Sequence, residues 1–350
     1  MSSERPPSTS TLVPSLRSAG PAFGAMIVVA CVLPFVVSDY RVFQLTLVIT
    51  NAIALIGLNL LTGYGGQVSL GHGAFYAIGA YTSAILIEHF HVPPWLTIPC
   101  AGVACLGAGI LFGLPAARLE KLYLALATFA LGVTLPQILK YKHIEAWTGG
   151  VQGITLTKPS APNGIPLTPD QWLYFLSLTT MVVAWAGVWN LLRGHVGRAV
   201  VAIRDRPLAA AAMGIDVARY KALTFGVSAM CTGIAGALAA MAVQFVGPDS
   251  FSFFLSLSLL VGIVIGGLST LSGAVYGAFF IHFVPSVAGD ISKAAPLAIY
   301  GVLLIGVVYA MPSGIAGALA ELGRRWSAKR RAPLPHPSDR RDTQPGRNHA

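Results

Sequence analysis

The feature that most constrains this chain is a succession of apolar runs, each about as long as a helix that crosses a lipid bilayer. Such a helix needs about 20 apolar residues to span the hydrocarbon core. Few charges interrupt the runs: 10% of the 350 residues are charged and 55% are hydrophobic, whereas soluble domains carry about 25% charged residues. We therefore expect an all-α polytopic membrane protein.

Ten runs are candidate transmembrane helices, and only glycine-rich joints separate the second from the third and the eighth from the ninth. Each of these two pairs is too long for one span, so we expect a helix break within it. The ten runs cover about residues 21–38, 42–62, 71–90, 95–115, 122–139, 171–192, 222–245, 253–271, 274–289 and 296–312.

The positions of lysine and arginine predict how the chain is oriented. If the amino terminus is cytoplasmic, most of these residues fall on the same side, above all in the loop 193–221 and after residue 312. Cytoplasmic segments of membrane proteins carry this excess of positive charge. We therefore expect both termini to be cytoplasmic.

Polar segments flank and interrupt the membrane domain, which we place at residues 21–312. Residues 1–20 and 313–350 lack apolar periodicity, so we expect disordered cytoplasmic tails, the second of them basic. The loop 140–170 would lie outside, and its Gly, Pro and Thr residues indicate an ordered cap.

The loop 193–221 is much longer than a turn between two spans requires. Pro207 suits the first turn of a helix, the alanines that follow favour helix, and Gly214 suits a left-handed stop. We expect a short helix that offers a docking surface, with arginines available to grip acidic groups on a partner. The alternative is an ordinary solvated loop that its arginines retain inside.

The stretch "GYGGQVSLGHGAF", residues 63–75, places glycines and uncharged polar residues between two apolar runs. Non-helical backbone at membrane depth persists only where protein buries it or where it lines a wet cavity. The joint therefore indicates a passage for a zwitterionic solute, and a tight cytoplasmic turn is the alternative. A second joint begins at Gly266 with similar residues. The candidate pathway residues are Gly65, Gly66, Gln67, Ser69, His72, Gly73, Tyr76, Gly266, Gly267 and Ser269.

Four segments, in chain order, resemble the permease subunits of branched-chain amino-acid ABC transporters. They are "GYGGQVSLGHGAFYAIGAYTSAIL" at 63–86, "TGGVQGI" at 148–154, "GRAVVAIRDRPLAAAAMGIDVARYKALTFGVSA" at 197–229 and "GGLSTLSGAVYGAF" at 266–279. The extra first span and the long outside loop are similar to the larger of the two permease partners.

The resemblance implies a multi-pass protein of the bacterial inner membrane that works with several partners. These are a second homologous permease subunit, two ATP-binding subunits and a periplasmic solute-binding protein; no nucleic acid is involved. The chain has no phosphate-binding Gly-x₄-Gly-Lys-Ser/Thr motif, so we expect no cofactor here and ATP–Mg in the partner subunits. The residues implied in coupling to the ATPase are Arg198, Ile203, Arg204, Asp205, Ala209, Ala210, Gly214 and Ile215.

Two other functions remain as alternatives to an importer subunit for branched-chain or other small polar amino acids. An ion-coupled carrier or channel usually buries carboxylates within its spans, but here Glu88 alone lies inside a candidate span, near its end. An intramembrane serine hydrolase is more remote. Ser69 and His72 are three residues apart, yet no Gly-x-Ser-x-Gly motif surrounds the serine. We therefore do not expect an enzyme. The cysteines show no metal-ligand spacing, so we also expect no metal site.

Overall fold

The computed structural model describes residues 30–119, 121–161, 166–291, 301–302, 304–307, 309, 311 and 313–330. Within these residues the chain is helical apart from short connections and one two-stranded sheet. The expected all-α membrane class is therefore confirmed.

Six helices in the described part are long and apolar enough to cross a membrane. They are α2 (Asp39–Asn59) continued by the π-helix η2 (Leu60–Tyr64), α4 (Pro94–Ala116), α5 (Lys121–Leu139), α7 (Pro169–Arg193), α10 (Val217–Val243) and α12 (Leu271–Ile291). Two further helices are shorter: α3 (His72–Glu88) has 17 residues and α11 (Phe253–Gly266) has 14. Residues 30–36 are also helical.

Eight of the ten expected runs coincide with these helices, and the other two lie largely outside the described residues. One boundary was wrong: the run 253–271 ends at Gly266, because Gly267 has φ 119° and Ser269 has φ 60°. A backbone with positive φ cannot continue a right-handed helix. The second joint therefore lies at 267–270.

Helix α10 forms the centre of the bundle and packs against α2, α3 and α4. Small residues allow this close approach, as is usual for helices in lipid. On α3, a Cβ added at Gly79 would collide with the backbone of Gly233 in α10. On α10, a Cβ added at Gly236 would likewise collide with the Tyr76 carbonyl oxygen of α3. The crossing of these two helices therefore depends on Gly79 and Gly236.

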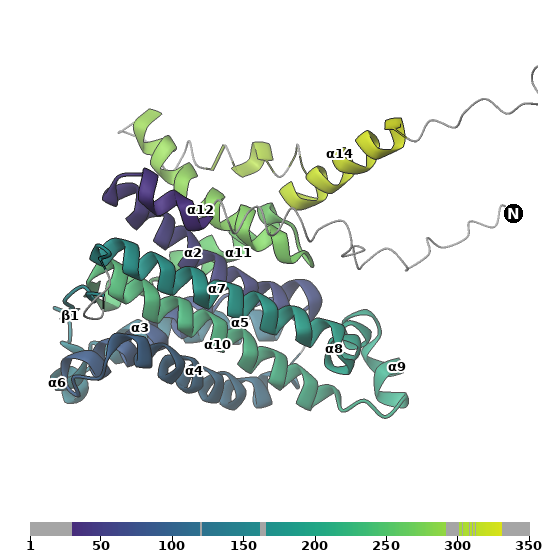
Figure 1. The fold of residues 1–350 in the computed structure, drawn as a ribbon. Helices are drawn as coiled ribbons and strands as arrows, with labels where there is room; N and C mark the ends of the chain where they lie inside the picture. Colours follow the sequence, from purple (N-terminus) through teal and green to yellow (C-terminus); the bar gives the residue numbers. More distant parts are fainter. Residues whose placement is uncertain are drawn as a thin grey trace, which may run out of the picture.

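Ordered segments lie at both ends of the bundle (Figure 1). At one end, strand β1 (Ile154–Thr155) pairs antiparallel with β2 (Phe245–Val246), beside η3 (Lys142–Ile144), α6 (Glu145–Thr148) and η4 (Pro248–Phe251). Lys140 Nζ lies 2.5 Å from Asp249 Oδ1 and ties this sheet end to α5.

The opposite end, which we call the loop end, carries α8 (His195–Asp205) and α9 (Pro207–Ala212). The expected short helix is confirmed in detail: α9 begins at Pro207, and Gly214 follows it with φ 83°. The sequence reading did not anticipate α8.

The carboxyl-terminal segment differs from its expected disorder. Residues 314–330, within the predicted tail 313–350, form helix α14 (Gly314–Arg330). Its alanines, leucine and arginines are strong helix formers, and Gly314 lies against Gly267 at the second joint. The segments 1–20 and 331–350 lie outside the described residues.

We predict that Gly79→Leu disrupts the packing of α3 on α10, because its side chain has no space beside Gly233. Overpacking of this kind costs about 1–3 kcal/mol. The matched control is Gly107→Leu on α4, where nothing lies within 4 Å of an added Cβ. Thermal unfolding in detergent measures both, and equal melting temperatures would contradict this account of the crossing.

Candidate functional site

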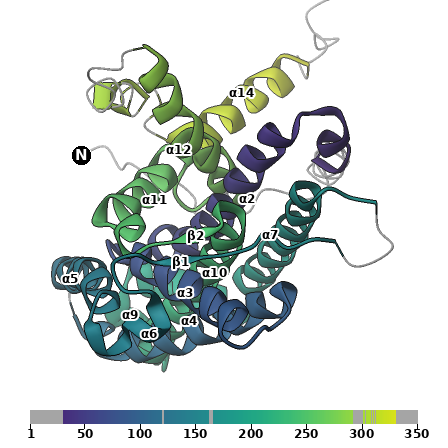
Figure 2. The same cartoon turned by 90° about the vertical axis from the view of Figure 1, so that its left-hand side faces the viewer.

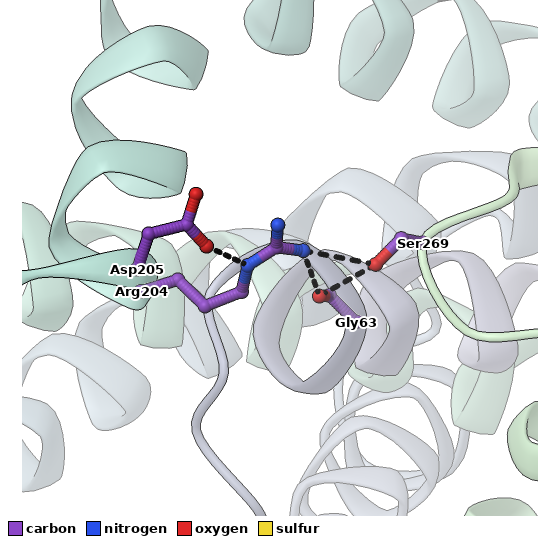
Figure 3. Close-up of polar contacts among 4 residues, drawn as sticks. All are labelled: Gly63, Arg204, Asp205 and Ser269. Atoms are coloured by element: carbon purple, nitrogen blue, oxygen red, sulfur yellow. Dashed lines mark hydrogen bonds and ion pairs between the residues drawn. The ribbon is translucent and has the colours of Figure 1, made fainter. Parts of the chain in front are cut away.

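Arg204, at the end of α8, joins the loop 193–221 to both helix joints (Figure 3). Its guanidinium donates to the carbonyl oxygen of Gly63 at 3.0 Å and to the hydroxyl of Ser269 at 3.2 Å. The Ser269 hydroxyl donates in turn to the same Gly63 oxygen at 2.7 Å. One cationic side chain therefore contacts the end of η2 and the α11–α12 connection together.

The stem of Arg204 also requires a glycine in the first joint. Gly66 has φ 65°, and an added Cβ there would lie 2.6 Å from Arg204 Cγ. Asp205 Oδ1 accepts from Arg204 Nε at 3.0 Å and fixes the guanidinium from the solvent side. The Arg204 side chain is 23% exposed and points inward, so the expectation that it grips an acidic group on a partner does not describe its position here.

Asn59 in α2 holds the second joint in shape. Its amide nitrogen donates to the carbonyl oxygen of Thr270 at 2.7 Å, and its oxygen accepts from the Ser269 N–H at 3.0 Å. The sequence analysis missed Asn59, although amides inside an apolar run, here Gln44, Asn51 and Asn59, were a usable signal. Its contacts keep the backbone polar groups of 269–270 satisfied where lipid could not.

The first joint extends from the loop end to the middle depth of the bundle. It begins at Gly63 beside Arg204 and continues without helix from Gly65 to Gly71. The Leu70 N–H then donates to Thr128 Oγ1 at 3.0 Å, and Thr128 lies near the middle of α5. The joint therefore runs from the loop end to the level of the middle of α5, and the choice between a solute passage and a tight turn stays a prediction.

A chain of hydrogen bonds fixes the deep end of this joint. The Ser228 hydroxyl donates to Gly57 O at 2.6 Å, so its oxygen accepts from His72 Nε2, which is 2.7 Å away. His72 Nδ1 then accepts from the Ser69 hydroxyl at 2.8 Å. The imidazole has no free nitrogen, and Ser69, His72 and Ser228 are all fully buried. These hydrogen bonds connect α2, α3 and α10 to one another.

The structure brings most of the candidate pathway residues together in two adjacent joints, but it buries them. Gln67 is 6% exposed and Tyr76 is 7% exposed. Gly73 donates its N–H to Ser256 Oγ of α11 at 2.8 Å. In this conformation the joints are packed against α5, α10 and α11, and the pathway assignment stays a prediction.

The candidate coupling residues divide between a buried and an exposed side of the loop. Ile203 and Ala210 are each 5% exposed and anchor α8 and α9. Arg198 is exposed and donates to Arg193 O at 3.3 Å, and Gly214 has open space around it. Two apolar residues that the sequence reading missed, Leu208 and Met213, are 87% and 83% exposed. Large apolar side chains in such positions are typical of a protein contact.

We predict that Ser228→Ala destabilises the protein by about 1–3 kcal/mol, because it leaves His72 Nε2 buried without a partner. Thr232→Ala is the control one turn along α10, since Thr232 only adds a bond to the Ser228 carbonyl of its own helix. The free energy of unfolding in detergent should fall clearly more for the first variant. A larger effect of Thr232→Ala would refute the hydrogen-bond chain.

Comparison with known proteins gives consistent matches. A family profile described as "Branched-chain amino acid transport system / permease component" matches residues 40–311. High-affinity branched-chain amino acid transport system permease protein LivM of Salmonella typhimurium is 31% identical over 314 residues, 83% of this chain and 73% of LivM. LivH of Escherichia coli, named as a permease protein of the same kind of system, is 24% identical over 294 residues, 78% of this chain and 92% of LivH.

The chain also matches a permease protein whose name gives a different solute, the Autoinducer 2 import system permease protein LsrC of Klebsiella pneumoniae. It is 32% identical over 151 residues, which cover 40% of this chain and 42% of LsrC. No solved structure matches the chain.

Proposed function

The chain belongs to the family of permease components of branched-chain amino acid transport systems, and from this membership we propose that it is the LivM-like permease subunit of an ATP-driven amino-acid importer. It is a multi-pass inner-membrane protein and not itself an enzyme. Its partners would be a second homologous permease, two ATP-binding subunits that hold ATP–Mg, and a periplasmic solute-binding protein.

We further propose about ten spans with both termini in the cytoplasm, so that the loop end is cytoplasmic and the sheet end is periplasmic. The support is the density of arginines in the loop 193–221. In this orientation α8, α9, Leu208 and Met213 face the compartment that contains ATP. The remaining residues 1–20 would be a cytoplasmic tail.

The observation that carries the proposed coupling route is the contact of Arg204 with both helix joints. A motor subunit that moves α8 would displace the end of η2 and the α11–α12 connection at the same time. Both joints contain residues with positive φ, namely Gly66, Gly267 and Ser269, and such element ends absorb hinge motion. Closure of the ATPase would therefore switch the side to which the passage opens.

The transported solute would be a branched-chain amino acid, as the names of LivM and LivH say of those proteins. The match to LsrC is a reason to test other small polar solutes as well. The chain should be reconstituted with its ATPase, second permease and binding protein in vesicles, and uptake measured over a panel of amino acids. ATP-dependent uptake of leucine, isoleucine and valine is the expected result. Uptake by the chain alone, driven by a proton or sodium gradient, would replace the proposal with a carrier.

We predict that Arg204→Gln uncouples ATP hydrolysis from uptake, because it removes the charge that holds both joints to α8. Uptake should fall at least about tenfold, equivalent to about 1.4 kcal/mol, while ATPase activity persists. The control is Arg219→Gln, whose side chain is 86% exposed and pairs only with Asp216 among the described contacts. Parallel losses of hydrolysis and uptake in Arg204→Gln would count against a coupling role.

A further inference from the structure

Helix α11 starts in the middle of the bundle and is too short to cross a bilayer. Its 14 residues span about 21 Å, against a hydrocarbon core of about 30 Å. The rings of Phe253, its first residue, and Phe129 of α5 lie 4.8 Å apart, and Phe129 is near the middle of α5. The bond from Gly73 to Ser256 fixes the same depth.

The chain between the sheet end and α11 therefore passes through membrane depth without an α-helix. It comprises β2, Gly247, the 3₁₀ turn η4 and Ser252. Asp249 is exposed at the sheet end and its carboxylate pairs with Lys140 Nζ. Ser250 and Ser252, which lie between Asp249 and Phe253, are exposed as well. Lipid cannot satisfy such groups, so this backbone must face protein or water.

Apolar side chains continue the same face toward the loop end. Phe254 is 70% exposed on α11, and Leu126 and Val133 are 56% and 44% exposed on α5. Figure 2, viewed from the sheet end, shows α5 and α11 side by side on one flank of the bundle. We call this surface, formed by α5, η4 and α11, the α5–α11 face.

Two other exposed helices among the described residues have no such break. Helix α7 is continuous over 25 residues and α4 over 23, although α4 contains Pro99 and Pro115. Exposed positions of α4 include Val103 at 68% and Leu111 at 75%. A long regular helix with apolar outward residues can face lipid directly, because all its backbone bonds are internal. The α5–α11 face differs from these helices in needing a cover.

We propose that the second permease subunit covers the α5–α11 face. Its apolar half, around Phe254 and Leu126, packs against that subunit, and its polar half, around Asp249 and Ser252, walls a water-filled entrance between the two subunits. This rests on the proposed function, which supplies a homologous permease as partner. The entrance leads toward the deep end of the first joint, because Ser256 follows Ser252 by one helical turn and contacts Gly73.

Site-specific photo-crosslinking in the assembled transporter tests the packing. p-Benzoylphenylalanine should be placed singly at Phe254 and Leu126, and as controls at Val103 and Leu111 on α4. After irradiation in native membranes, covalent adducts are identified by mass spectrometry. We expect positions 254 and 126 to form adducts with the second permease. The two control positions on α4 should form no such adduct.

The outcomes separate this inference from the proposed function. The second permease could copurify while adducts form from α4 alone or from no position. Either result would overturn the proposed interface but would leave the proposed importer function valid. Adducts to a second copy of this chain would contradict the paired-permease occupant. If no second permease copurifies with the chain, the proposed function itself fails.

Accessibility to a membrane-impermeant thiol reagent tests the entrance. Cys31 and Cys100, which are exposed, are first replaced by serine. In the complex reconstituted in sealed vesicles, Ser252→Cys should then be labelled when the reagent is on the sheet side. Val103→Cys, which faces lipid, should be labelled much less. Absence of labelling at Ser252→Cys would exclude a water-filled entrance there.

Discussion

The structure depends on one constraint: a bilayer offers no hydrogen-bond partners to broken helices. The two joints meet this constraint with side chains from neighbouring helices. Asn59 serves the α11–α12 connection, while Thr128 and Ser256 serve the segment that leads into α3. Because each partner lies on a different helix, the joints can change shape only if several helices move together. This makes them suitable as hinges of a gate and unsuitable as independently flexible loops.

Arg204 connects both joints to the loop 193–221. Its guanidinium contacts Gly63 and Ser269, and its aliphatic stem lies over Gly66. A single residue of α8 therefore contacts both joints. The exposed side chains of Leu208 and Met213 offer the surface that a motor subunit would contact. In the proposed mechanism, docking and transmission would thus be divided between different residues of the same loop.

Sequence periodicity and helix-capping residues sufficed for the membrane class, for most helix positions and for α9, because these depend on local composition. Pro207 and Gly214 stand where a helix start and stop require them. The sequence also grouped Gly66 with Ser269 as joint residues. It could not show that Arg204 turns inward, because that contact joins residues 141 and 65 positions apart. Nor could it show that α11 begins at middle depth. The apolar run 253–271 is long enough for a full span, and only contacts such as that of Phe253 with Phe129 place the start of the 14-residue helix within the bundle.

The central claim is that the segment formed by α8 and α9 moves as one unit with the second joint when the motor binds nucleotide. Electron–electron double resonance between spin labels measures this directly in the assembled transporter. Leu208, Leu268 and Leu111 provide exposed positions on α9, the second joint and α4. The account predicts that the 208–268 distance stays constant while both the 208–111 and 268–111 distances change with ATP. A change in the 208–111 distance with no change between 268 and 111 would contradict it.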